Sequence, residues 1–106
     1  MQESIALTEA VFYILLSLYQ PMHGYGIMQN VAQFSNGRVN LAAGTLYGAL
    51  NTLLEKGWIR PEHTEESIRK KEYAITQSGR AAVEAELVRL QELIANGRKV
   101  AGGKRI

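Results

Sequence analysis

The polar residues best placed to do chemistry lie together in the stretch from Gly44 to Glu55. With 100° between successive residues of a helix, its leucines gather on one side, and the first half of the opposite side has no long side chain. The hydroxyl and amide groups on or beside that opposite side belong to Thr45, Tyr47 and Asn51. Such groups can donate to phosphates or read base edges in a DNA major groove.

Gly48 lies in the interior of this predicted helix, where glycine costs about 1 kcal/mol relative to alanine. Its presence indicates that exposed backbone is needed at that point. Free N–H groups and the positive end of the helix dipole favour an anion near the start of a helix, so the stretch predicts contact with a phosphate chain. The alternative is that Gly48 allows close packing against another helix.

Three consecutive cations, Arg69, Lys70 and Lys71, lie at or beside the tip of a predicted hairpin. Next to a helix of this kind they are placed to meet the DNA backbone that flanks the groove, whereas alone they would be an ordinary solvated loop. The net charge of +2 is only weak evidence for nucleic-acid binding, because four basic residues fall in the last nine positions and the preceding part is slightly acidic. Residues 98–106 are expected to form a basic flexible tail, either solvated or in contact with phosphate.

The chain lacks the residue sets that catalysis or metal binding needs. It has no cysteine and no aspartate, and nothing near His23 or His63 completes a metal site or supplies a nucleophile with its base. No strand is predicted before the Gly24-Tyr25-Gly26 stretch and no Gly-Lys-Ser/Thr follows it, so it is not expected to be a nucleotide-binding loop. No enzyme activity, metal or cofactor is expected.

A chain of 106 residues can form one compact domain with a modest core, to which a partner chain could add. The absence of cysteine favours a reducing compartment. The longest apolar run, Ala10 to Leu18, is too short to cross a bilayer, and no positively charged leader precedes it. The expectation is a cytoplasmic protein without a membrane partner.

Apolar spacing and capping residues predict four helices. Thr8 caps the first helix, Gly24 the second and Thr76 the fourth, while Gly57 ends the third in the left-handed position. The Asn96-Gly97 pair is expected to stop the fourth helix. The predicted ranges are residues 8–19, 25–34, 43–56 and 77–96.

A small antiparallel sheet is predicted to accompany these helices. Residues 58–62 and 71–75 form a hairpin around a polar loop, and Pro61 lies on an edge strand because it has no N–H to donate. Val39 to Leu41 alternates briefly and is interpreted as a short strand. The fold class is therefore mainly α with a small antiparallel sheet, in the order of a winged helix-turn-helix followed by a last helix.

Three blocks of the chain resemble the PadR family of bacterial transcriptional regulators: PMHGYGIMQNV at 21–31, GTLYGALNTLLEKGWI at 44–59 and RKKEYAITQSGR at 69–80. The resemblance covers about residues 5–95. It implies a dimeric winged-helix repressor that binds an inverted-repeat operator and is often released by a small ligand. Many members have proline where this chain has Gly48, which leaves base reading at that position open.

The resemblance also assigns places to individual residues. Gly44, Thr45 and Tyr47 fall at the start of the recognition helix, with Tyr47 as a contact to the DNA backbone. Tyr25 opens the preceding helix, and residues 69–71 belong to the wing. The candidate DNA-binding residues are Tyr25, Ala43, Gly44, Thr45, Tyr47, Gly48, Asn51, Arg69, Lys70 and Lys71.

The last helix has an apolar seam of residues that step by four, three and four: Val83, Leu87, Leu90 and Ile94. The seam either closes over the chain's own core or, as we prefer, joins a second copy. Phe12 and Tyr13 lie off the core side of the first helix and are expected to meet the partner's last helix. The predicted division is a DNA-binding domain at 1–76, a dimerisation helix at 77–97 and the tail at 98–106.

A small-molecule effector would find few aromatic side chains to contact in the last helix. The last helix has no aromatic residue between Gln77 and Asn96, Trp58 is assigned to the core or the sheet, and a hydrophobic effector would reach Phe12, Tyr13 or Tyr19. The alternative function is a winged helix that binds proteins without touching DNA, which would suit the acidic body. Double-stranded DNA and a second copy of the chain remain the preferred partners.

Overall fold

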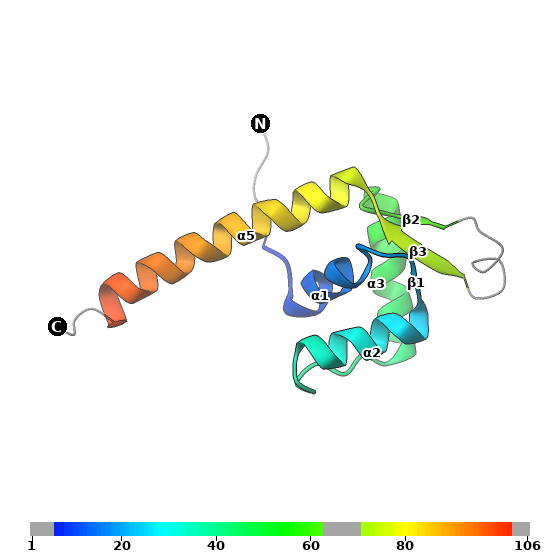
Figure 1. Ribbon diagram of the computed structural model, residues 1–106, viewed down its shortest axis with the longest axis horizontal. Coiled ribbons are helices and arrows are strands. Elements are labelled where there is room, and N and C mark those ends of the chain that lie inside the picture. Colours follow the sequence, from blue (N-terminus) through cyan, green and yellow to red (C-terminus); the bar gives the residue numbers. More distant parts are fainter. Residues whose placement is uncertain (1–5, 63–70, 103–106) are drawn as a thin grey trace.

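The computed structural model describes residues 6–62 and 71–102 of the chain. Three short helices and a small sheet form the body, and a long helix leaves the body and projects from it (Figure 1). The fold class predicted from the sequence is confirmed. The helices are α1 (Glu9–Ser17), α2 (Gly24–Phe34), α3 (Ala43–Lys56) and α5 (Gln77–Gly97), followed by a π-helical turn, η1 (Arg98–Gly102).

Every element of the body contributes to one apolar core, and α5 adds Val83 to it. Most of the periodic apolar residues of α1, α2 and α3 point inward, so the spacing seen in the sequence is used for packing there. The buried side chains are Ile14, Leu15 and Leu18 around α1, Ile27 and Val31 of α2, Leu46, Leu50 and Leu53 of α3, and Ile59, Ile75 and Val83.

The sheet has three antiparallel strands in the order β1-β3-β2, namely β1 (Met22–His23), β2 (Ile59–Pro61) and β3 (Glu72–Ile75). The predicted hairpin is confirmed, and Pro61 lies on an edge strand as expected. The third strand was not predicted, because β1 is only two residues long and is defined by its pairing with β3.

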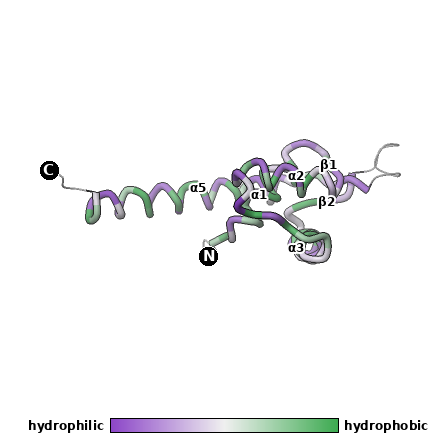
Figure 2. The backbone as a smooth tube through the Cα atoms, turned by 90° about the horizontal axis from the view of Figure 1, so that it is seen from below, coloured by the Kyte–Doolittle hydropathy of each residue, from purple (hydrophilic) through white to green (hydrophobic). Residues whose placement is uncertain are grey.

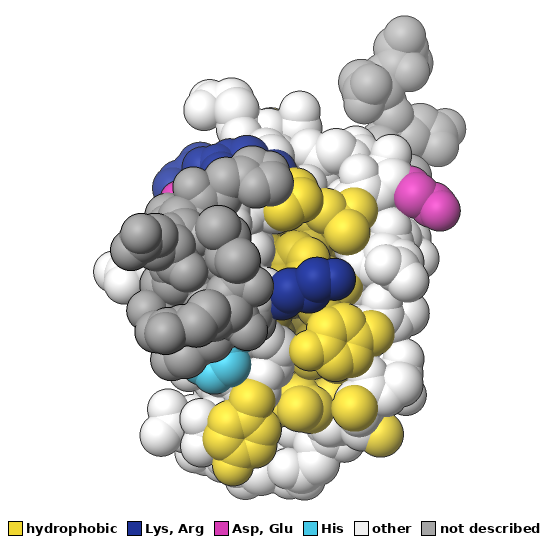
Figure 3. Space-filling model, turned by 90° about the vertical axis from the view of Figure 1, so that its right-hand side faces the viewer, with side chains coloured by type: hydrophobic (Ala, Val, Ile, Leu, Met, Phe, Trp, Pro, Cys, Tyr) yellow, Lys and Arg dark blue, Asp and Glu magenta, His cyan; other side chains and the backbone are white. Residues whose placement is uncertain are grey.

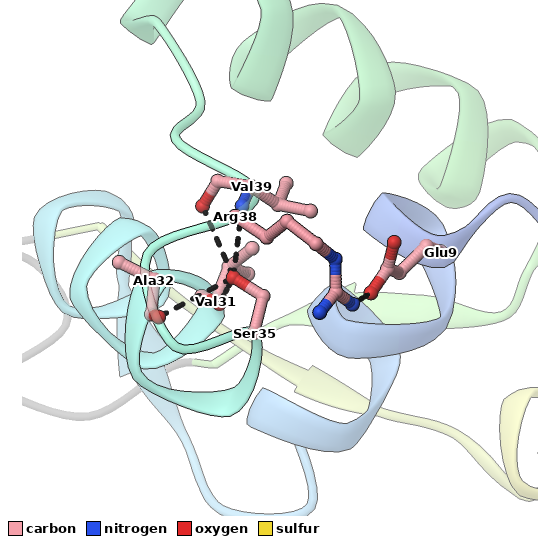
Figure 4. A network of polar contacts seen from close by, with 6 residues as sticks. All are labelled: Glu9, Val31, Ala32, Ser35, Arg38 and Val39. Carbon is pink, nitrogen blue, oxygen red and sulfur yellow. Dashed lines mark hydrogen bonds and ion pairs between the residues drawn. The ribbon is translucent and has the colours of Figure 1, made fainter.

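The predicted strand at Val39 to Leu41 is wrong, because this segment is held as an irregular connection between α2 and α3. The buried Ser35 hydroxyl donates to the Val31 carbonyl at 2.9 Å and accepts the Val39 N–H at 2.9 Å (Figure 4). Arg38 forms an ion pair with Glu9 of α1. The bond to Ser35 occupies the Val39 N–H that a strand would offer to a neighbour.

The predicted ends of the helices are largely confirmed. The Thr8 hydroxyl accepts the Val11 N–H at 3.1 Å at the start of α1, and α1 ends two residues before the predicted Tyr19. Gly57 ends α3 with φ of 75°. Gly24, however, is the first residue of α2 and not its cap, which is His23 without a side-chain hydrogen bond.

One hydroxyl joins the hairpin to α5. Thr76 accepts the Gly79 N–H at 3.1 Å, as a capping residue does, and also donates to the Gly57 carbonyl at 2.6 Å. Gly79 lies against the Trp58 carbonyl, where a Cβ would also come within 2.6 Å of Ile75 Cγ1. The start of α5 is thereby fixed against the end of α3 and the hairpin.

The α-helix α5 ends at Gly97, within the predicted Asn96-Gly97 stop, but the chain does not turn away there, because the π-helical turn η1 follows directly as far as Gly102. The radius of gyration is 16.0 Å, against roughly 13 Å for a compact domain of this length. The far half of α5 lies beyond the body in both views, with hydrophobic and hydrophilic residues interspersed along it (Figures 1 and 2). The projection explains the extended shape.

A buried carboxylate ties α5 to the segment before α1. Glu86 is only 3% exposed, accepts the Leu7 N–H at 3.3 Å and pairs with both ends of the Arg89 guanidinium, at 3.0 and 2.6 Å. The hydrogen bonds from Arg89 lower the pKa of Glu86, and the bond from Leu7 acts in the same direction against the opposing effect of burial. The carboxylate is therefore held in its charged form.

Candidate nucleic-acid interface

The N-terminal half of α3 is open on the side away from the core. Gly44, Thr45, Gly48 and Asn51 are all exposed. A Cβ added at Gly44 or Gly48 would meet nothing within 4 Å in the described part of the chain. Close packing of Gly48 against another helix, the alternative explanation of this glycine, does not occur within the described residues.

The start of α3 has no capping side chain among the described residues. Its capping residue is Ala42, which has no side-chain hydrogen bond to offer, and its first turn contains no acidic residue. The first N–H groups of a helix have no partner inside the helix, and together with the dipole they favour a nearby anion. Ala43, the first residue of α3, is exposed as well.

Tyr47 links this helix to α2 and to the sheet. Its ring lies on Gly24, where a Cβ would come within 2.9 Å of Tyr47 Cζ, yet the side chain is still 43% exposed. Burial raises the pKa of Tyr73 in β3, and the neighbouring Tyr47 raises it further. Sequence reasoning assigned Gly24 to a cap, but the feature that requires glycine is this contact with a residue 23 positions away.

The neighbouring start of α2 presents Tyr25, which is 63% exposed. On the hairpin, Lys71 is exposed and has a positive φ of 56°, while the predicted contacts Arg69 and Lys70 lie outside the described residues. Arg60 of β2 pairs with Glu62 at 2.6 Å. At this end of the molecule, hydrophobic side chains run in a band beside the grey atoms, with basic side chains and a histidine close by (Figure 3).

The residues predicted for a dimer interface fall into two groups. Val83 is buried in the chain's own core, and Tyr13 stacks on Phe34 of α2 with ring centroids 5.4 Å apart. Phe12 is half-buried beside Tyr13, and Leu90 is also half-buried. The other two seam residues are open, Leu87 at 40% and Ile94 at 55% exposure.

Two further structural properties bear on function. No helix within residues 6–62 and 71–102 is long and apolar enough to span a membrane. Within the same ranges, no three histidine, cysteine, aspartate or glutamate side chains come together as a metal site would require.

The chain is similar to regulators in sequence and in fold. Over 66 residues, 62% of this chain, it is 41% identical to an uncharacterized 37.1 kDa protein in transposon TN4556 of Streptomyces fradiae, and the match spans 18% of that protein. A transcriptional regulator from Clostridium thermocellum has a TM-score of 0.69 and 22% identity, with 87% of this chain and 91% of that one covered. A PadR family transcription regulator from Clostridium difficile R20291 has a TM-score of 0.65 and 20% identity, with 84% and 95% covered.

The family assignment rests on the sequence match, because structural likeness at these identities shows the fold alone. Residues 11–85, well over half of the chain, match the Transcriptional regulator PadR-like family. That range contains all of the body's helices except the start of α1, together with the sheet and the beginning of α5. The resemblance noted in the three sequence blocks is thereby confirmed, and the chain belongs to the PadR-like family of transcriptional regulators.

Proposed function

We propose that this regulator binds duplex DNA with the open side of α3, assisted by the wing and by Tyr25. The observation that supports this most strongly is the exposed, contact-free face formed by Gly44, Gly48 and Asn51. A face without long side chains lets the helix backbone approach phosphates closely, and Asn51 can make a bidentate contact to adenine in the major groove. Thr45, Tyr47 and Lys71 would contact the backbone at its edges.

We further propose that the chain works as a homodimer on an inverted-repeat operator and represses transcription there. The open apolar side chains Leu87, Leu93 and Ile94 on the projecting half of α5 support a second copy as the partner, since a surface of this kind marks an interface. In this arrangement residues 1–76 contact DNA, residues 77–97 join the protomers, and the basic residues after Gly97 lie near the complex. Such a regulator acts in the cytoplasm, without a catalytic step, and a small molecule would release it.

Fragments of the source genome selected by the purified protein give the operator, and a gel-shift titration then tests the contacts. Asn51→Ala should reduce the preference for operator over random duplex by about 1–3 kcal/mol. Lys71→Ala should weaken binding to both duplexes alike and lower the slope of log K against log salt by about 1. Asn96→Ala, which makes the same change as Asn51→Ala on the projecting part of α5, serves as the control.

The salt series separates this function from a winged helix that binds only proteins. When binding depends on phosphate contacts, the slope of log K against log salt concentration is about −0.9 for each phosphate neutralised. If the protein binds no duplex DNA even at low salt, the proposal is wrong. If Asn51→Ala lowers the affinity for operator and for random DNA equally, Asn51 does not read the base sequence.

A further inference from the structure

The first turn of α2 contains two buried glycines, Gly24 and Gly26, on either side of the exposed Tyr25. Neither has a positive φ, which among the described glycines occurs at Gly37 and Gly57. The helical backbone at both positions would therefore accept an alanine. What demands glycine there is the space that a Cβ would take, and different elements occupy that space at the two positions.

A Cβ at Gly24 would collide with α3. Its nearest neighbours would be the outer atoms of the Tyr47 ring, namely the hydroxyl oxygen, Cζ at 2.9 Å and Cε1 at 3.5 Å. An aromatic ring is rigid beyond its two side-chain torsions. A methyl group at Gly24 could thus be accommodated only by turning the whole ring, which moves its hydroxyl, or by pushing α3 away from α2.

Gly26 provides a comparison within the same helix. A Cβ there would meet the sulfur of Met22, with Met22 Cγ at 3.0 Å and His23 Cε1 at 3.3 Å. Methionine has three rotatable bonds and adapts to its neighbours. Both neighbours belong to β1, so an alanine at Gly26 asks β1 to adjust and leaves α3 in place.

The Tyr47 ring lies where α2, α3 and the sheet meet. Met22 of β1, two residues before Gly24, pairs with Tyr73 of β3. Burial raises the pKa of Tyr73 and the nearby Tyr47 raises it further, so the two phenols are neighbours. The ring therefore has contacts in α2 and β3, although 43% of the side chain remains exposed.

We infer that Gly24 is a positioning residue for DNA binding, because its missing side chain gives the Tyr47 phenol a fixed place at the start of α2 from which the hydroxyl reaches the DNA backbone. A donor that is already held in place loses less conformational freedom on binding than a mobile one. The inference rests on the proposed function, in which Tyr47 contacts the backbone, and adds what fixes that contact. Gly24 itself touches no DNA and acts through Tyr47.

Gel-shift titrations of the full chain on operator DNA test this role with two matched methyl groups. Gly24→Ala should lower the affinity by about tenfold to a hundredfold, the worth of one hydrogen bond to a charged phosphate, whereas Gly26→Ala should leave it nearly unchanged. In the Tyr47→Phe background, Gly24→Ala should add no more than about twofold, because no hydroxyl remains to be misplaced.

Circular dichroism and urea unfolding measure whether each variant is folded at the binding temperature. If Gly24→Ala does not fold, the double variant with Tyr47→Leu continues the test, since leucine lacks the three ring atoms that the methyl group would meet. The double variant should then fold as well as Tyr47→Leu alone.

Three results would overturn the positioning role. The first is equal operator affinity of folded Gly24→Ala and Gly26→Ala. The second is a loss of the same size in the Tyr47→Phe background, which would show that the methyl group displaces the whole of α3. The third is a Gly24→Ala, Tyr47→Leu protein that is as unfolded as Gly24→Ala.

Failure of the proposed function gives a different result. If the original protein binds no duplex at low salt, DNA binding is wrong and the positioning role is wrong with it. If the original protein binds the operator and Gly24→Ala binds it equally well, only the positioning role is wrong.

Discussion

Gly48 and Gly79 are both helical glycines, but their surroundings differ completely. A Cβ at Gly48 would meet open space, whereas a Cβ at Gly79 would collide with the Trp58 carbonyl and approach Ile75 Cγ1 within 2.6 Å. Gly79 is needed for packing within the chain. Packing within the described residues gives no reason for Gly48. The close approach of DNA proposed above would account for its cost to the helix.

Gly48→Ala should therefore raise stability and weaken DNA binding at the same time. The free energy of unfolding should increase by about 0.5–1 kcal/mol, because alanine is the better helix former. Operator affinity should fall roughly tenfold, or about 1.4 kcal/mol, if the added methyl group holds the helix away from the phosphates. Urea unfolding and a gel-shift titration measure the two effects.

Gly79→Ala is the matched control for stability, since the same methyl group there should destabilise the fold. Unchanged operator affinity in folded Gly48→Ala protein would show that DNA does not approach this position. A contact other than DNA would then have to account for a glycine at this position.

Residues whose role depends on their immediate neighbours could be predicted from the sequence. Thr8 and Thr76 cap helices and Gly57 ends one, because each feature requires only a local hydrogen bond or a left-handed residue. Gly24 could not be predicted in the same way. Its neighbour Tyr47 is brought to it by the crossing of α2 and α3, which no local pattern specifies.

At the scale of elements, the buried carboxylate of Glu86 helps to hold α5 against the segment before α1. Glu86 holds the Leu7 N–H and the Arg89 guanidinium, and the resulting hydrogen bonds keep its pKa below the usual value. A carboxylate with a lowered pKa in the folded state stabilises that state above its unfolded pKa, and the contribution is lost as the pH falls through the folded pKa.

Glu86→Gln should consequently make stability less sensitive to acid. At neutral pH the variant should lose about 1–2 kcal/mol, since an amide makes weaker hydrogen bonds to Arg89 and Leu7 than a carboxylate does. The difference from the original protein should shrink as the pH falls below about 4.3, the usual pKa of glutamate. Urea unfolding at several pH values and one protein concentration measures this difference.

Glu84→Gln, at an exposed position of the same helix, is the control and should change stability little. A difference between Glu86→Gln and the original protein that stays constant down to strongly acidic pH would contradict the ionised, hydrogen-bonded state of Glu86.

Elements with a strong local pattern were predicted more accurately than those made by pairing. The bounds of α3 match the prediction because its leucines, its start and Gly57 agree with one another. The two residues of β1 have no pattern of their own and become a strand only beside β3. Residues 39–41 do alternate between apolar and polar types, but the Val39 N–H is bound to the Ser35 hydroxyl and the segment forms no strand.

At the scale of the whole molecule, the projecting half of α5 determines what a second copy would contact. Leu87 and Ile94 are open on the side that continues from buried Val83. The seam thus begins inside the chain's own core at Val83, and its exposed residues Leu87 and Ile94 are available to the proposed interface.

Replacing Leu87 and Leu90 together by glutamate should yield monomers, because two charges would have to be buried in the interface. Operator affinity should fall by about a hundredfold or more, as binding through both half-sites is lost. Sedimentation and gel-shift titration measure the two effects.

Ala81→Glu with Ala85→Glu adds the same charges to exposed positions on the opposite side of α5 and should leave association unchanged. A Leu87 and Leu90 variant that sediments like the original protein would place the interface elsewhere.

The Thr76 hydroxyl, which binds both the end of α3 and the start of α5, has a consequence for operator spacing. Strand β3 ends at Ile75 and α5 begins at Gln77, so this junction offers no free linker about which the two units could swivel. Two half-sites at an altered separation would have to be accommodated by bending of the outer part of α5 or by twisting of the DNA. The proposed dimer should accordingly tolerate changes in base sequence within a half-site better than insertions between half-sites.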